Sequence, residues 1–215
     1  MSAVIGITYL HLLGALGLTA VSSVNPISDS IIAYIIEIVL LFVLLFAMLA
    51  IPPSPLKYVL FAAFAITIGQ LLTRFVAQLN TKNVLKDVLV TVAGIFLAMT
   101  ALGFYDNQNI LGFGSYLLAA LFGLIVARLF LIVGAVGGAS AESVSAGSNI
   151  LSFLGAALFS VYVAYDTQRL KEFARGRGRG RGGSSSKGSP DYVDASLGLF
   201  LDAINLFESV GDIMD

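Results

Sequence analysis

Residues 29–51 read DSIIAYIIEIVLLFVLLFAMLAI, and a proline-rich turn, PPSP, follows them. Beyond the first residue of this stretch, Glu37 is its only charge. About 20 consecutive apolar residues are enough for a helix to cross the hydrocarbon core of a bilayer, and proline cannot continue a helix. The stretch therefore predicts a transmembrane helix that ends at the proline turn.

The rest of the chain has the same character. Of its 215 residues, 58% are hydrophobic and 12% are charged, and the mean hydropathy is +0.93. A soluble domain of this length needs far more surface charge, so this composition excludes one. Cysteine is absent, which excludes a disulfide framework and a thiolate metal site.

Seven apolar blocks predict seven membrane spans, because each block is long enough to cross and none shows the alternation of a strand. The spans lie at roughly 3–23, 29–51, 56–79, 84–104, 111–137, 148–168 and 191–212. We therefore expect one all-α polytopic membrane domain over residues 1–215. Its membrane would be the plasma membrane in a prokaryote, and the endoplasmic reticulum or another internal membrane in a eukaryote.

Seven of the 12 basic residues cluster in one predicted loop, residues 169–189. Loops rich in Lys and Arg stay in the cytoplasm, so we place this loop there, together with the N-terminus six spans earlier. Arg74, Lys82 and Lys86 flank a connection on the opposite side. The Arg-Gly run at 175–183 resembles RNA-binding segments. We favour a flexible loop that touches anionic lipid headgroups over nucleic-acid binding.

The seventh block carries a polar stripe. Its members recur at steps of three and four and so share one helical face, namely Asp191, Asp194, Gly198, Asp202, Asn205, Ser209 and Asp212. Such a face cannot contact lipid. Either this helix lies inside the bundle, with the other six wrapped around it, or it dips into the membrane and returns.

Charged residues inside the predicted spans are candidates for function, because each costs at least a few kcal/mol in the membrane interior. They are Glu37, Arg128, Asp166 and Asp202. We consider Glu37 as a partner for Arg128. His11, the lone histidine, lies in the first span, where a packed hydrogen-bonding role is favoured over a pH switch.

Asp166 shares a helical face with Ser152, Gly155, Phe159 and Tyr162, and Asn205 follows Asp202 by one turn. If the two faces meet, the bundle centre holds two carboxylates flanked by an amide and a phenol. Such a pair titrates as a unit, and its oxygens suit a divalent cation such as calcium. The alternative is that Asp166 caps a helix end beside Arg169 and that Asp202 anchors internal hydrogen bonds.

Several motifs resemble the Bax inhibitor-1 family. The most specific lie in the C-terminal third: Tyr165-Asp166-Thr167-Gln168, Pro190-Asp191-Tyr192-Val193, and Leu199-Phe200-Leu201-Asp202-Ala203-Ile204-Asn205-Leu206-Phe207. Further similarity runs through Thr8-Tyr9-Leu10-His11-Leu12, Glu37, Ile68-Gly69-Gln70-Leu71-Leu72 and Gly112-Phe113-Gly114-Ser115-Tyr116-Leu117. The resemblance covers essentially the whole chain.

The resemblance implies seven helices, six of them around a semi-polar last one, and a proton-sensitive calcium leak rather than an enzyme. It assigns calcium and proton sensing to Asp166 and Asp202. We predict Glu37, Asn205 and Tyr162 as supporting residues. Calcium would be a permeant or transient ligand, not a tightly bound cofactor. Some members also have an arginine at the cytoplasmic end of the second helix, which latches to the sixth-helix aspartate. Here Met48-Leu49-Ala50-Ile51-Pro52 provides no basic residue before Lys57.

Asp191 and Asp194, at the end of the basic loop, are expected to attract the cation before it enters the path. A non-conducting regulator of cell death, acting through membrane-protein partners, is the main alternative function. An intramembrane aspartyl protease is a lesser one: Tyr165-Asp166 fits the first half of that motif, but Leu199-Phe200-Leu201 stands where Gly-x-Gly should precede the second aspartate.

Overall fold

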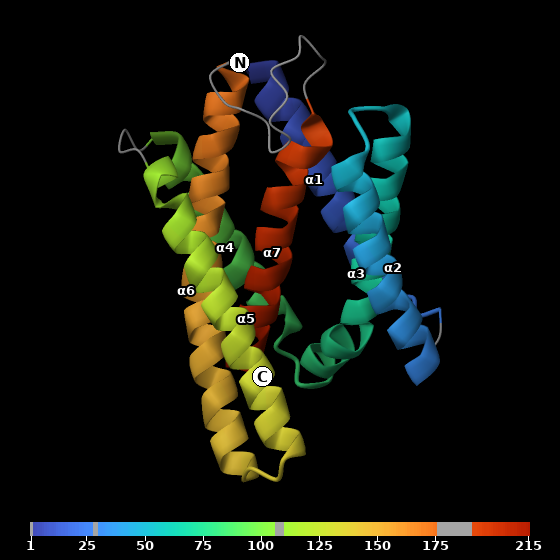
Figure 1. Ribbon diagram of the computed structural model, residues 1–215, viewed down its shortest axis with the longest axis vertical. Coiled ribbons are helices and arrows are strands. Elements are labelled where there is room, and N and C mark those ends of the chain that lie inside the picture. Colours follow the sequence, from blue (N-terminus) through green and yellow to red (C-terminus); the bar gives the residue numbers. More distant parts are fainter. Residues whose placement is uncertain (1, 28–29, 106–109, 176–190) are drawn as a thin grey trace. The chain divides into compact units, whose positions relative to one another are not determined.

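The computed structural model describes residues 2–27, 30–105, 110–175 and 191–215 (Figure 1). In these ranges the chain is all-α, as predicted, and no strand occurs. The elements are α1 (Ser2–Ser23), α2 (Ile31–Ala50), α3 (Pro55–Thr81), α4 (Leu85–Tyr105), a short 3-10 helix η1 (Ile110–Phe113), α5 (Gly114–Val136), α6 (Ala141–Ala174) and α7 (Tyr192–Met214).

The chain divides into two compact units. Unit 1 comprises Met1–Thr81 with Leu170–Phe200, and unit 2 comprises Lys82–Arg169 with Leu201–Asp215. Helices α6 and α7 each contribute one part to either unit. The two units are described separately below.

Six helices, α1 to α6, are long and apolar enough to cross a membrane. Among the described helices α7 does not meet this standard, although its sequence predicts a seventh span. The reason is its acid content: Asp194, Asp202, Glu208 and Asp212 interrupt the apolar residues. It is nevertheless one unbroken helix, about 35 Å long at 1.5 Å per residue, so it does not turn back between Tyr192 and Met214.

Burial explains how α7 carries its acids. None of residues 192–213 is exposed, and Leu199, Phe200 and Leu206 are completely buried. A helix that is enclosed along its length meets protein rather than lipid on its polar side. The semi-polar character predicted for this helix is therefore compatible with a membrane.

Helix α6 is longer than the predicted span 148–168, which corrects the predicted loops on both of its sides. At its start, the Ser140 hydroxyl accepts a hydrogen bond from the Ser143 amide (3.2 Å), and Glu142 lies in the first turn, where an acid is favourable. At its end, the helix continues through Ala174, so the predicted basic loop begins only after it. The remainder of that loop, residues 176–190, lies outside the described residues.

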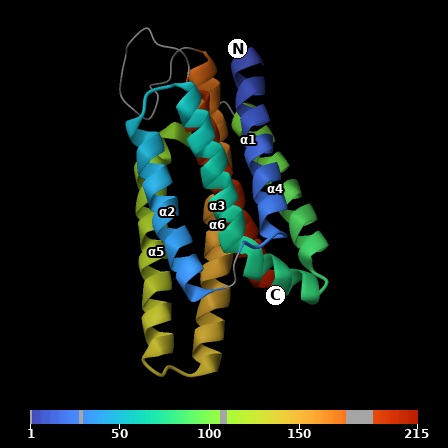
Figure 2. The same cartoon turned by 90° about the vertical axis from the view of Figure 1, so that its right-hand side faces the viewer.

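In unit 1, α3 packs against both α1 and α2. Helices α2 and α3 run side by side and are joined by the proline turn (Figure 1, Figure 2). The contact between α1 and α3 is close because Gly69 has no side chain: a Cβ there would lie 2.5 Å from the Thr19 carbonyl oxygen and 2.6 Å from Ser22 Cβ. Small residues at helix contacts let backbones approach in this way in membranes.

Hydrogen bonds reinforce this contact. The Thr19 hydroxyl donates to the Ala65 carbonyl oxygen (2.9 Å) and the Ser22 hydroxyl donates to the Ile66 carbonyl oxygen (2.8 Å). Next to them, the Gln70 amide nitrogen donates to the carbonyl oxygens of Ser22 and Asn25, and its amide oxygen accepts from the backbone of Ile27. Gln70 thereby ties the connection after α1 to α3.

Unit 2 contains α4, α5 and most of α6, with the second half of α7. Helix α4 approaches α6 closely at Gly103, where a Cβ would lie 2.6 Å from the Ala164 carbonyl oxygen and 2.8 Å from Thr167 Cβ. Helices α5 and α6 are joined by a short turn (Figure 1). The turn contains Gly138, whose positive φ of 90° is easily adopted by glycine.

Replacing Gly69 with alanine is expected to lower the free energy of unfolding by about 1–3 kcal/mol, because the new methyl would press on the α1 backbone. Gly17→Ala is the matched control. It also changes a helical glycine, but nothing lies within 4 Å of the added carbon, so we expect no loss. Thermal unfolding in detergent, followed by circular dichroism, measures both. Equal losses in the two variants would contradict the close-contact explanation.

Candidate functional site

The two predicted sensor aspartates lie in the same unit. Asp202 belongs to the part of α7 in unit 2 and is only 6% exposed. Asp166 belongs to the part of α6 in unit 2 and is half-buried. The structure therefore holds both carboxylates within one compact unit.

The predicted supporting residues of this unit lie one helical turn from the aspartates. Tyr162 precedes Asp166 on α6, and its ring meets that of Tyr165 edge-on, with centroids 6.4 Å apart. Asn205 follows Asp202 on α7 and donates its amide hydrogen to the Leu201 carbonyl oxygen at 2.7 Å. The amide oxygen is the atom that Asn205 can offer to a cation, because the amide nitrogen is a donor only.

Further along α7, a second polar cluster joins three helices of unit 2. Asp212 accepts a hydrogen bond from the Ser152 hydroxyl of α6 at 3.0 Å, and one of its oxygens lies 3.8 Å from the Arg128 guanidinium of α5. Glu208 lies one turn earlier on α7. The partner of Arg128 is thus Asp212, not Glu37 as we considered from the sequence, since a stripe of acids does not show which one faces another helix.

In unit 1, both acids at the beginning of α7 bind one lysine. Lys57, near the start of α3, lies 2.5 Å from a carboxylate oxygen of Asp191 and 2.7 Å from one of Asp194. The lysine side chain is only 3% exposed. Asp191 also accepts a hydrogen bond from the Asp194 amide (3.1 Å), so it caps α7 at its N-terminus.

This triad bears on the predicted role of Asp191 and Asp194 in attracting a cation. One ammonium compensates one of the two carboxylates, so a single net negative charge is left to act on a cation. The attraction of a cation by Asp191 and Asp194 remains a prediction. The sequence shows the two acids but does not show that Lys57 is their partner. Lys57 is 134 residues away from Asp191 along the chain, so only the fold brings them together.

His11 packs beside the same triad. Its Nδ1 lies 2.7 Å from the Ile7 carbonyl oxygen, and its ring contacts those of Tyr58 and Tyr192 with centroids 5.0 Å and 6.3 Å away. The predicted packed hydrogen-bonding role is confirmed. The first turn of α7 is therefore held to α1 and α3 by an ion cluster and an aromatic stack.

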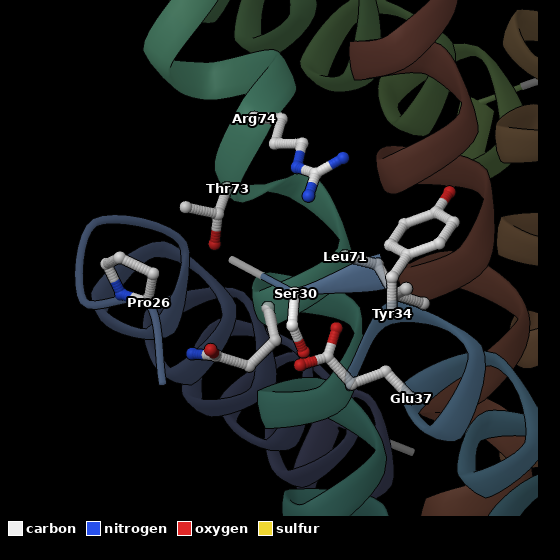
Figure 3. Close-up of a pocket in the computed structure, with 8 residues that line it drawn as sticks. Pro26, Ser30, Tyr34, Glu37, Leu71, Thr73 and Arg74 are labelled. Atoms are coloured by element: carbon white, nitrogen blue, oxygen red, sulfur yellow. The ribbon is translucent and has the colours of Figure 1, made fainter. Parts of the chain in front are cut away.

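Glu37, the remaining predicted supporting residue, lies in unit 1. It lines a small open pocket between α2 and α3, together with Pro26, Ser30, Tyr34, Gln70, Leu71, Thr73 and Arg74 (Figure 3). The acid predicted from the second span therefore shares a pocket with a basic residue of the third.

None of the described residues forms a group of three or more His, Cys, Asp and Glu side chains that could hold a metal ion. Calcium takes six to eight oxygen ligands. Calcium binding at Asp166 and Asp202 therefore remains a prediction.

Replacing Lys57 with methionine is expected to lower the free energy of unfolding by about 3–5 kcal/mol, because two enclosed carboxylates would lose their counter-charge. Lys82→Met is the matched control. That lysine pairs with Asp215 at 3.0 Å, but its side chain is 46% exposed, so the loss should stay within about 1 kcal/mol. Thermal unfolding in detergent measures both.

A triple variant separates charge from packing in this experiment. Adding Asp191→Asn and Asp194→Asn to Lys57→Met removes the uncompensated charges and keeps a capping side chain at 191. Most of the lost stability should return. A triple variant as unstable as Lys57→Met would show that the lysine stabilises by packing alone.

Comparison with known proteins agrees with the motifs and the helices. All of residues 1–215 match the family described as inhibitor of apoptosis-promoting Bax1. A protein of Deinococcus radiodurans is 30% identical over 148 residues, which cover 69% of this chain and 58% of the relative. A protein of Borreliella burgdorferi is 33% identical over 116 residues, covering 54% and 44%. The chain thus spans about half the length of these two relatives.

A third relative is named for its membrane. The inner membrane protein YbhL of Escherichia coli K12 is 27% identical over 179 residues, which cover 82% of this chain and 70% of the relative. This relative, the six apolar helices and the whole-length family match lead to one conclusion. The chain is a multi-pass integral membrane protein and belongs to the Bax inhibitor-1 family.

Proposed function

We propose that this protein is a pH-sensitive calcium leak, in which Asp166 and Asp202 sense protons and contact the passing ion. The observation that carries the proposal is the burial of Asp202 on an enclosed helix, in the same compact unit as Asp166. A carboxylate inside a membrane protein is costly, and such residues commonly mark ion and proton paths. The family match supports the same assignment.

Oxygen atoms continue along α7 beyond Asp202. Asn205, Ser209 and Asp212 follow on the same face, and Ser209 is buried. From Asp202 to Asp212 the helix advances about 15 Å, half the thickness of a hydrocarbon core. Such a stripe offers a dehydrating calcium ion successive oxygen contacts, as a leak requires, instead of one tight site.

The pH sensitivity follows from competition. A carboxylate oxygen that binds a proton loses the charge that attracts calcium, and carboxylates that lie close to one another titrate as a coupled pair. Protons and calcium therefore act on the same two side chains. Tyr162 and Asn205, one turn from each, complete the group on which the proposal rests.

Calcium influx into dye-loaded liposomes, measured at several pH values, tests the proposal. Wild-type protein should conduct with a rate that depends on pH. In Asp166→Asn/Asp202→Asn the pH dependence should disappear, because both titrating carboxylates are gone. Asp87→Asn is the control: it removes an exposed acid from the first turn of α4 and should conduct like wild type.

Two results would overturn the proposal. A double variant that leaks like wild type at every pH would remove Asp166 and Asp202 from the path. No flux above empty liposomes, from protein whose fold is verified by circular dichroism, would favour the non-conducting, partner-binding role instead.

A second experiment tests whether Asp191 and Asp194 attract the ion. Neutralising both to asparagine together with Lys57→Met removes the net negative charge of the triad. Flux should fall at low ionic strength, where surface charge is least screened, while its pH dependence stays as in wild type. Unchanged flux would assign the triad a purely structural role.

A further inference from the structure

The pocket that contains Glu37 lies close to the start of α2 and the end of α3. Ser30 caps α2, with its hydroxyl accepting from the Ala33 amide at 3.0 Å, and Glu37 lies six residues further, about 9 Å along the helix. Arg74 lies seven residues before the end of α3, about 10 Å from it. Both helices are membrane spans, so the pocket lies near one membrane surface, where lipid headgroups meet acyl chains.

The pocket wall presents opposite charges from two helices. Figure 3 shows Arg74 on the α3 side and Ser30 and Glu37 on the α2 side, with the Ser30 side chain pointing toward the Glu37 carboxylate. The guanidinium of Arg74 lies over the Tyr34 ring, 5.9 Å from its centroid, which orients it. A guanidinium recognises phosphate through paired hydrogen bonds, and a carboxylate recognises an ammonium group.

Gln70 fixes the position of one part of the pocket wall in unit 1. Its side chain is used in bonds to Ser22, Asn25 and Ile27, which hold the connection between α1 and α2 in place. Pro26, on this connection, forms part of the pocket wall. The wall therefore consists of α3 and of two segments packed against it, namely the connection after α1 and α2.

The surroundings of the pocket favour a lipid over a free anion. Ile31 and Ile35 each follow a pocket residue of α2 by one position, so they form the neighbouring helix face, and they are 65% and 56% exposed. Ile27, on the adjoining connection, is 80% exposed. An acyl chain whose headgroup lies across the open mouth of the pocket can cover this apolar face, whereas inorganic phosphate gains nothing from it.

We propose that this pocket binds a phospholipid whose headgroup carries both a phosphate and an ammonium group, as in phosphatidylethanolamine. Arg74 holds the phosphate, and Glu37, beside Ser30, holds the ammonium. The proposal is independent of calcium conduction, since it involves unit 1 alone.

Native mass spectrometry of the detergent-solubilised full chain tests this assignment, with phosphatidylethanolamine and phosphatidylglycerol titrated separately. Wild type should retain phosphatidylethanolamine more tightly than phosphatidylglycerol. Arg74→Gln should weaken both by about tenfold, because a charge-assisted contact to the shared phosphate is lost. Glu37→Gln should abolish the preference for phosphatidylethanolamine and leave phosphatidylglycerol binding intact or stronger.

Lys86→Gln is the matched control, since it removes an exposed positive charge from α4, outside the pocket, and should bind both lipids like wild type. If Lys86→Gln lost as much lipid affinity as Arg74→Gln, binding would depend only on general charge attraction, and the proposed site would be overturned. An unchanged lipid preference in Glu37→Gln would overturn the ammonium assignment. Displacement of lipid by millimolar inorganic phosphate, with the same dependence on Arg74, would assign the pocket to a free anion instead.

Discussion

The bilayer core contains no water to solvate a charge or an unpaired amide, and this constraint shapes every polar feature of the protein. The acids of α7 exist in such a chain because the helix is enclosed along its length. Several of these acids have specific partners. Lys57 pairs with Asp191 and Asp194, and Asp212 contacts Ser152 and Arg128. An acidic helix can therefore belong to a membrane protein when other helices enclose it and when polar or basic side chains pair with its acids.

The same constraint explains how the apolar helices associate. Lipid tails are as apolar as leucine, so the transfer of leucine side chains from lipid to a helix contact does not drive the association of α1 and α3. They meet at Gly69 instead, where the backbones approach, and the hydroxyls of Thr19 and Ser22 donate to carbonyl oxygens across the contact. Gln70, next in sequence, extends this hydrogen bonding to the connection that forms the pocket wall. One short motif therefore supports both the helix contact and the pocket.

The sequence predicts the helices well because apolar length and proline are strong, local signals. It misplaces the ends of α6, where small residues such as Ser140 and Ala141 carry little hydropathy and a hydroxyl cap decides the boundary. It predicts Asp166 and Asp202 as the sensor residues, and the structure adds that one unit contains both. It cannot pair Lys57 with Asp191, or Arg128 with Asp212 instead of Glu37, because periodicity describes one helix at a time and such pairs join residues far apart in the chain.

The low apolarity of α7 has a consequence for how the protein is made. Helices α1 to α6 are long and apolar enough to cross a membrane, whereas the four acids of α7 oppose its transfer into lipid on its own. We expect its insertion to require helices that are already in the membrane and can enclose it. The partners of its first turn, Lys57 and His11, belong to helices that are synthesised much earlier. For this helix, membrane insertion and tertiary folding are one event. A lesion in the receiving helices would then appear as a failure of biogenesis.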